Sequence, residues 1–223
     1  MSEAAVAVKE RPILFSAESV RGILDGRKTQ TRRVVTEAYK SRRKDGCKLV
    51  PELLRDIGVG CACPYGKPGD RLWVREATES YHLPNIITGE PTNGLCGRYK
   101  CDESPVVNEH GFDLVWWHSK PTCPSIFMPR WASRITLEIV SVRVERVQEI
   151  SEADAQAEGS ERPELSSHVL PGCPPPFNVV HPLTGSLRDG FSLLWDSINA
   201  KRGYGWEANP FVWVIEFKKL EAN

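Results

Sequence analysis

The sequence lacks a long apolar run and an excess of charge of either sign. No run of 18 or more apolar residues occurs in its 223 residues, which argues against a transmembrane helix. Residues 1–10 have neither the basic start nor the apolar segment of a secretory signal. We therefore expect a flexible tail over residues 1–10, no membrane partner and a cytoplasmic location. The 29 basic residues equal the 29 acidic residues in number, so no global basic field attracts nucleic acid.

The cysteines lack regular spacing. Seven are present, and five of them lie between Cys61 and Cys123, with His110 and His118 in the same stretch. Their spacings are not the paired C-x2-C type of common zinc sites. A zinc site among these residues stays open as an alternative, but reduced thiols are the simpler interpretation in a chain without a signal peptide. We expect no metal and no other cofactor.

Charge is nevertheless separated along the chain. Cations gather between Arg27 and Lys44, whereas acidic residues gather between Glu145 and Glu164. The stretch Gly26 to Arg33 reads Gly-Arg-Lys-Thr-Gln-Thr-Arg-Arg and holds four cations and two hydroxyls. Core packing does not require that composition, so the stretch predicts a catalytic surface or one that faces a polyanion.

The residues around this stretch predict a strand, a helix and a second strand. Residues 11–15 are strand-like, Ser16 is a favoured N-cap, and Gly26 is a favoured residue just after a helix. Alternating β-branched residues then indicate a strand. In strict alternation Lys28 and Thr31 point to opposite faces of that strand. They can meet only if Lys28 still belongs to the turn after Gly26, which we expect.

The remaining pattern predicts a mixed α+β fold. We expect strands at 71–76, 133–147 and 210–217, with a change of phase near Val140 in the second of them. Helices are expected at 151–159 and 189–199. Long inserted loops are expected at about 36–63, 77–125 and 160–188, with short hairpins near 96–101 and 112–118. Few helices and mixed strands favour a small closed β-barrel with short flanking helices. We expect a single domain over residues 11–220.

Four ordered motifs resemble those of the ASCH family, whose fold is a PUA-like β-barrel. They are Gly26-Arg27-Lys28-Thr29-x-Thr31-x-Arg33, Gly69-Asp70 before a strand, Ile150-Ser151-Glu152-x-x-Ala155-x-x-Glu158-Gly159, and Val212-x-Val214-Ile215-Glu216-Phe217. The motifs span roughly half of the chain, and the rest corresponds to inserts absent from short bacterial members. The longer layout is similar to that of ASCH proteins encoded by phages and prophages.

The resemblance implies a nucleoside- or RNA-related function. One group of short ASCH proteins comprises N4-acetylcytidine amidohydrolases, and their catalytic set falls on Lys28 as base, Thr31 as nucleophile and Glu158 as proton donor. A threonine hydroxyl needs a base to become nucleophilic. Lysine serves only when neutral, a state that neighbouring arginines favour by like-charge repulsion. A solvated turn lysine and an ordinary strand threonine are the alternative. Other ASCH members imply a ribonuclease or an RNA- or modified-nucleic-acid-binding module.

Arginines of the same stretch are candidates for substrate binding. Arg33 is placed to clamp a phosphate or a carbonyl, or to pair with an acid. We expect Arg27 and Arg32 to be exposed and suited to contacts with a nucleic-acid backbone. The expected partner is a nucleoside, RNA or modified nucleic acid, and nothing in the sequence specifies an oligomeric state.

Two aromatic–cation pairs are further candidates. Trp73 and Arg75 share a face of a predicted strand, and Arg130 and Trp131 lie at a strand entry. An aromatic ring beside a cation can stack on a base. Packing of both tryptophans in the core or at its rim is the alternative.

Overall fold

The computed structural model describes residues 8–36, 63–85, 87–163 and 185–221. The chain divides into two compact units, which we call the first and second unit. The first contains Met1–Thr29, Gly60–Val142 and Glu216–Asn223, and the second contains Gln30–Val59 and Arg143–Ile215. Most of the predicted inserts at 36–63 and 160–188 lies outside the described residues.

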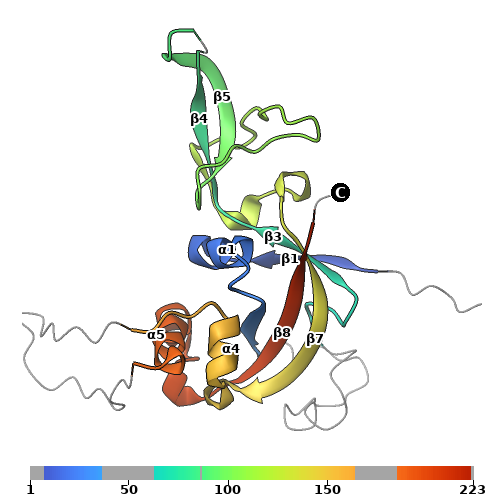
Figure 1. Cartoon of the computed structure of the whole chain (residues 1–223), viewed down its shortest axis with the longest axis vertical. Helices are drawn as coiled ribbons and strands as arrows, with labels where there is room; N and C mark the ends of the chain where they lie inside the picture. Colours follow the sequence, from blue (N-terminus) through green and yellow to red (C-terminus); the bar gives the residue numbers. More distant parts are fainter. Residues whose placement is uncertain (1–7, 37–62, 86, 164–184, 222–223) are drawn as a thin grey trace, which may run out of the picture. The chain divides into compact units, whose positions relative to one another are not determined.

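Strands and helices are mixed in the described chain, which confirms the predicted α+β class (Figure 1). The strands are β1 (Glu10–Leu14), β2 (Gln30–Val34), β3 (Arg71–Arg75), β4 (Thr78–Pro84), β5 (Pro91–Tyr99), β6 (Thr122–Cys123), β7 (Thr136–Arg146) and β8 (Phe211–Leu220). The α-helices are α1 (Ala17–Leu24), α4 (Glu152–Ala157) and α5 (Leu187–Asn199). Short 3-10 helices are η1 (Ser125–Phe127), η2 (Arg130–Ala132), η3 (Val147–Glu149), η4 (Ala200–Arg202) and η5 (Trp206–Ala208). None of the described helices is long and apolar enough to cross a membrane.

Five strands are hydrogen-bonded in the order β1-β3-β7-β8-β2. β1 runs parallel to β3, and β3 runs antiparallel to β7 with Leu72 opposite Leu137. Among the described strands the hydrogen bonds leave β1 and β2 as edges, so they do not close the predicted barrel. Along β7 the buried side chains change phase from Leu137 and Ile139 to Val144. This change confirms the slip expected near Val140.

The first unit has its own apolar core. Its fully buried side chains include Ile13, Val20, Ile23, Leu72, Val74, Ile135, Leu137 and Ile139. The turn before β3 is tied to this core by Asp70, whose carboxylate accepts from the backbone N–H groups of Lys9 at 3.1 Å and Lys67 at 3.2 Å. Burial alone would raise the pKa of Asp70, but those two hydrogen bonds lower it. Lys9 and Glu10, predicted as part of a tail, are therefore anchored.

A long hairpin, β4 and β5, also belongs to the first unit (Figure 1). The two strands pair in antiparallel register, with Tyr81 opposite Cys96, and β6 pairs with the other edge of β4. The segment that follows β5 folds back as a second hairpin, in which Val107 faces Asp113. The chain also turns directly after β5, where Arg98 faces Pro105, so the hairpin expected near 96–101 is present. The β4–β5 hairpin itself is not predicted from the sequence.

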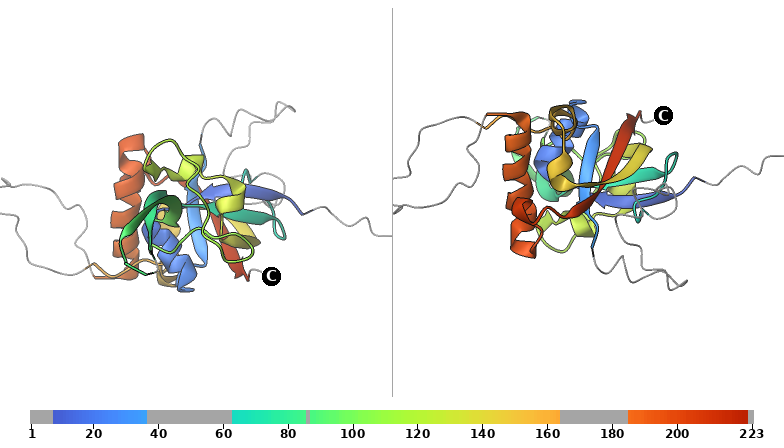
Figure 2. Two further views of the ribbon diagram at one scale, coloured as in Figure 1. Left: turned by 90° about the horizontal axis from the view of Figure 1, so that it is seen from above. Right: turned by 90° about the horizontal axis from the view of Figure 1, so that it is seen from below.

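The second unit contains α4 and α5, which contact each other (Figure 2). Both helices contribute to an apolar cluster. Ser151 caps α4 by accepting from the backbone N–H of Asp154, and Gly159 ends it with a φ of 75°. These are the predicted boundaries. The cluster contains Val147, Ile150, Ala155, Phe191, Trp195, Trp206, Val212 and Val214. On α5 Ile198 is 54% exposed, whereas Asn199 is buried.

Candidate functional site

Lys28 lies in the first unit and is 5% exposed. Its backbone N–H donates to Gly22 O at 2.8 Å, and β2 begins only at Gln30. Lys28 therefore belongs to the turn after α1, as the alternation argument requires. Its Nζ lies 6.0 Å from the centroid of the Phe15 ring. A buried lysine against an aromatic face is not the solvated turn cation of the alternative interpretation.

Thr31 and Glu158 lie in the second unit. Thr31 is on β2 and 4% exposed, and Glu158 is the C-cap residue of α4 and 5% exposed. All three predicted catalytic side chains are thus buried, two in one unit and Lys28 in the other. Buried polar side chains are uncommon without a partner or a function.

Arg32 is the residue that the structure places beside Glu158. Its side chain is 0% exposed, and its Nη1 lies 3.3 Å from Glu158 Oε1. Its Nη2 lies 3.2 Å from Glu145 Oε2 and 3.3 Å from Asp154 Oδ2. The prediction that Arg32 is exposed is wrong. The acidic segment that follows Glu145 folds onto β2 and requires a cation there, because a buried carboxylate without one is costly.

Three neighbours, Gln30, Arg143 and Phe191, complete this group. We call the group the Arg32 cluster; its other members are Arg32, Glu145, Asp154 and Glu158. Gln30 Nε2 donates to Asp154 Oδ1 at 3.0 Å, and Arg143 Nη2 lies 2.9 Å from the same oxygen. The Phe191 ring centroid is 5.8 Å from Arg32 Cζ. Burial alone would raise the pKa of Asp154, but the hydrogen bond from Gln30 and the charges of Arg32 and Arg143 lower it.

A signal for the Arg32 cluster was present in the sequence. Gln30 and Arg32 are two residues apart on a predicted strand and therefore share a face, and Arg32 Nη1 donates to Gln30 Oε1. Two polar residues on one face of a strand need partners from another segment. The acid-rich segment was the available source.

The other arginines of the motif are more accessible. Arg27 is exposed, as predicted, and its Nη2 pairs with Asp25 at 3.1 Å. Arg33 is half-buried on β2. The ion pair of Arg27 with Asp25 and the half-burial of Arg33 do not identify a substrate. The binding roles of Arg27 and Arg33 therefore stay predictions.

The predicted aromatic–cation pairs lie in the first unit. The Trp73 ring centroid is 5.3 Å from Arg75 Cζ and 5.8 Å from Arg130 Cζ. Arg130 also pairs with Glu10 at 3.2 Å. Trp131 is 56% exposed, which excludes core packing for this ring. Trp73 is half-buried, with the two guanidinium groups near its ring.

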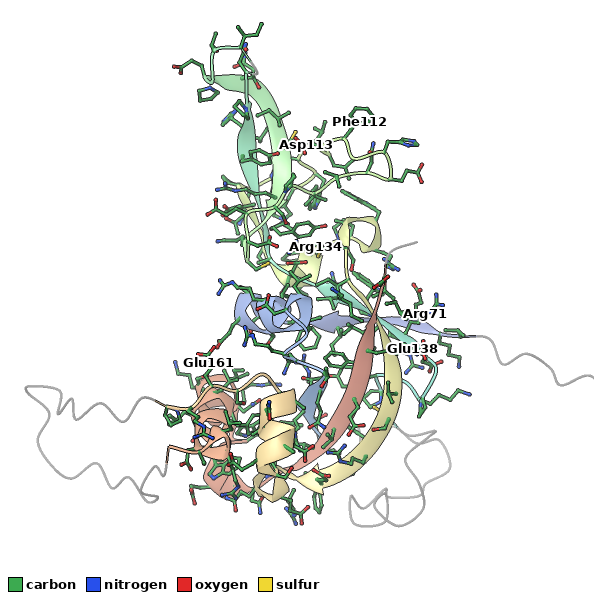
Figure 3. The ribbon with its side chains drawn as sticks, in the orientation of Figure 1. Arg71, Phe112, Asp113, Arg134, Glu138 and Glu161 are labelled. Atoms are coloured by element: carbon green, nitrogen blue, oxygen red, sulfur yellow. The ribbon has the colours of Figure 1, made fainter. Side chains whose placement is uncertain are left out.

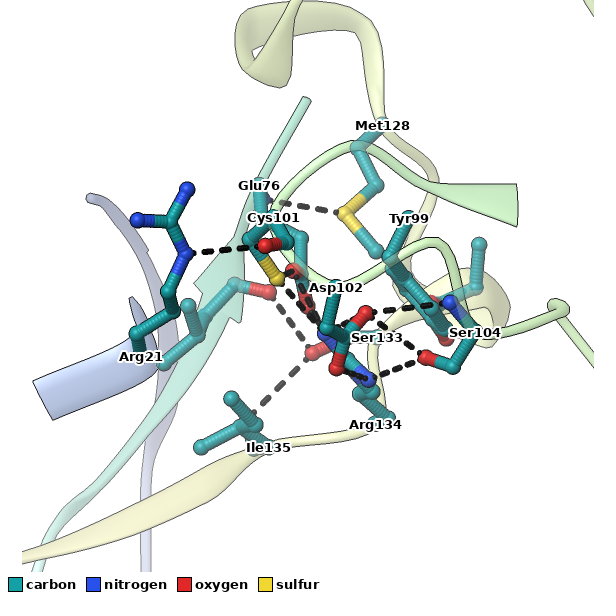
Figure 4. Close-up of polar contacts among 12 residues, drawn as sticks. Arg21, Glu76, Tyr99, Cys101, Asp102, Ser104, Met128, Ser133, Arg134 and Ile135 are labelled. Carbon is teal, nitrogen blue, oxygen red and sulfur yellow. Dashed lines mark hydrogen bonds and ion pairs between the residues drawn. The ribbon is translucent and has the colours of Figure 1, made fainter. Parts of the chain in front are cut away.

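A second arginine network was not foreseen from the sequence (Figures 3 and 4). Arg134 Nε and Nη2 each donate at 3.0 Å to a different oxygen of Glu76, which is 1% exposed. Arg134 Nη1 donates to Asp102 Oδ2 at 2.8 Å, and the guanidinium carbon lies 3.8 Å from the centroid of Tyr99. This network holds the end of β3, the turn after β5 and the start of β7 together.

Titratable groups of this network are shifted in opposite directions. Burial alone would raise the pKa of Asp102, but the hydrogen bonds from Arg134 and Ser104 lower it to about 2. Burial, together with the hydrogen bond to Glu76, raises the pKa of the Cys101 thiol to about 12. Cys101 is therefore a protonated donor to Glu76 Oε2 at 3.2 Å rather than a nucleophile.

The four described cysteines, Cys63, Cys96, Cys101 and Cys123, are buried and free, as expected for reduced thiols. Within the described ranges no three His, Cys, Asp or Glu side chains are grouped to hold a metal ion. Cys61, part of the alternative zinc reading, lies outside those ranges.

Comparisons with known proteins add no relative. No protein-family model, no curated protein and no solved structure matches the chain.

Proposed function

We propose that this chain is a hydrolase that removes an acyl group from a modified nucleobase or nucleoside, with an N4-acetylcytidine-like amide as substrate. The proposal takes the chain as an ASCH-type protein with a PUA-like arrangement of its strands. Lys28 is the base, Thr31 the nucleophile and Glu158 the residue that protonates the leaving nitrogen. The role of Lys28 rests on its place in the motif and on its burial.

The observation that carries the proposal is the setting of Glu158. Its carboxylate is 4% exposed at the C-terminal end of α4, where the helix dipole disfavours a negative charge. The fully enclosed Arg32, at 3.3 Å, offsets part of that cost. A buried ion pair is weak support for stability, since apolar residues often serve as well. An acid fixed in this way is the kind of group found at functional sites.

The reaction follows from these groups. Lys28 takes the proton of the Thr31 hydroxyl, and the threonine oxygen attacks the amide carbonyl to form a tetrahedral intermediate. Its collapse breaks the carbon–nitrogen bond, forms an acyl-threonine ester and releases the amine, which gains a proton from Glu158. Water then hydrolyses the ester and releases the carboxylic acid. The water proton passes to Glu158, and the proton held by Lys28 returns to the Thr31 oxygen, so both groups regain their starting state.

Release of acetate from N4-acetylcytidine by the purified full chain tests the proposal. Thr31→Ala and Glu158→Gln should each lower kcat/KM by at least about 100-fold, as expected for a nucleophile and a general acid. Thr29→Ala is the matched control, because Thr29 is exposed and two residues away. Circular dichroism and Tm establish that the variants fold. No acetate release from a panel of N-acylated nucleosides, or full activity in folded Thr31→Ala, contradicts the proposal.

A further inference from the structure

Five aromatic side chains of the first unit form a continuous row. We call Trp116, Trp117, His118, Phe127 and Trp131 the aromatic row. The Trp117 ring centroid lies 4.9 Å from that of Trp131 and 4.8 Å from that of Trp116. His118 continues the row, with its centroid 6.2 Å from Trp116 and 6.1 Å from Phe127. The row therefore connects η2, the segment after β5 and η1.

The two ends of the aromatic row are open to solvent. Phe127 is 63% exposed and Trp131 is 56% exposed, and Ile126 beside Phe127 is 55% exposed. Scattered exposed apolar residues are ordinary, but a contiguous set of large rings marks an interaction site. None of these residues is among the proposed catalytic groups Lys28, Thr31 and Glu158, so the row requires a separate explanation.

The row is fixed in place rather than loosely attached. A Cβ at Gly97 would lie 2.5 Å from Trp117 Cζ3 and 3.3 Å from Trp116 Cε3, so β5 carries glycine where the two indoles pack. Trp116 Nε1 donates to Lys120 O at 2.9 Å. Arg75 Nη2 donates to Ile126 O and so anchors η1. Rings held in advance lose little entropy when a ligand stacks on them.

Local charge decides between possible occupants. Residues 114–137 contain no Asp or Glu, although the whole chain has equal numbers of acidic and basic residues. The same stretch contains His118, Lys120 and Arg130, and Lys120 and Arg130 are exposed. Arg130 pairs with Glu10 at 3.2 Å. Planar rings beside cations match the flat bases and charged phosphates of a single strand.

We propose that the aromatic row is a binding surface for single-stranded nucleic acid, on which successive bases stack. Phosphates lie along Lys120 and Arg130. A double helix offers no unstacked base faces to such a surface, so single strands are preferred. The proposal does not depend on the hydrolase activity, because its residues lie in the first unit and Thr31 and Glu158 lie in the second.

Fluorescence anisotropy with fluorescein-labelled 15-mers of single-stranded uridine and thymidine, and with a duplex, tests this surface on the full chain. Binding of the single strands should weaken with salt, and Trp131→Ala and Phe127→Ala should each raise Kd by about tenfold, since each removes one stacking partner. Both side chains are exposed, so folding is kept. Val140→Ala is the matched control, because Val140 is 52% exposed on β7, outside the row.

Three results overturn the proposal. The first is no binding of single strands at about 50 mM salt, where contacts with phosphates are strong. The others are duplex binding as tight as single-strand binding, and an unchanged Kd in folded Trp131→Ala and Phe127→Ala. Self-association that Trp131→Ala abolishes, measured by light scattering without oligonucleotide, also overturns it. Thr31→Ala should keep the wild-type Kd, and Phe127→Ala should keep acetate release from the free nucleoside. Failure of one proposal is therefore distinguishable from failure of the other.

Discussion

Arg32 and Arg134 are two arginines with acidic partners, one in each unit, and they are used differently. Arg134 directs two nitrogens at one carboxylate, Glu76, and is 22% exposed. Arg32 divides its nitrogens among three carboxylates and is completely buried. A bidentate pair is a stable, directional clamp. A single cation shared among several acids controls where each of those acids lies.

The acids that each arginine holds show the consequence of this difference. Glu76 and Asp102 come from the end of β3 and the turn after β5, and Arg134 ties the turn down. Glu145, Asp154 and Glu158 come from β7 and α4, and one of them is the predicted proton donor. The Arg134 network therefore has a structural role, whereas the Arg32 cluster connects stability to the proposed chemistry.

Replacing Arg32 should have the largest effect. Arg32→Met leaves three buried or half-buried carboxylates without their shared cation and should lower the free energy of unfolding by about 3–5 kcal/mol. Urea unfolding followed by circular dichroism measures this loss. Arg27→Met, at an exposed arginine of the same motif, should change the free energy by less than about 0.5 kcal/mol. Equal effects of the two variants would mean that burial of Arg32 contributes nothing.

Replacing Arg134 with lysine should have an intermediate effect. Lysine keeps the charge beside Glu76 but cannot reproduce the two parallel hydrogen bonds. Arg134→Lys should therefore lower the free energy of unfolding by about 1–2 kcal/mol. Arg71→Lys is the matched control, because Arg71 is 46% exposed and its contact with Glu10 spans 3.9 Å. An unchanged free energy of unfolding in Arg134→Lys would show that charge alone maintains the network.

Local signals predicted much of the fold. Ser16, Gly26, Ser151 and Gly159 mark helix ends by backbone chemistry that operates within a few residues. A strand was likewise expected at 210–217, and it corresponds to β8, in which Val212 to Ile215 are buried. Closure of the sheet into a barrel depends on pairing between distant strands, which no local pattern specifies.

The candidate site was predictable only in part for the same reason. The burial of Lys28 and its place in a turn follow from residues next to it in sequence. The burial of Arg32 depends on acids 113 and 126 positions away, at Glu145 and Glu158. Composition suggested that Arg32 was exposed, because arginine is rarely buried alone. The pairing that reverses this expectation appears only when β2, β7 and α4 are assembled.

The smallest expected effect is the change of stability with pH. It compares an acidic partner of Arg134, Asp102, with an acidic partner of Arg32, Asp154. The pKa of Asp102 is lowered to about 2 in the folded chain from 3.8. Its contribution to stability is therefore complete above about pH 4 and is lost as the pH falls towards 2. Because its side chain is 33% exposed, solvent screening reduces the contribution to about 1 kcal/mol.

Asp102→Asn should therefore be less stable than wild type at pH 5, and the difference should shrink steadily at lower pH. Urea unfolding at about pH 5, 4 and 3 measures this trend. Asp154→Asn should show the same direction, since the pKa of Asp154 is also lowered. Its loss at pH 5 should be larger, because Asp154 contacts Gln30, Arg32 and Arg143 together. A difference that stays constant from pH 5 to 3 would show that shape and packing at these positions, rather than the charge on the carboxylate, stabilise the two networks.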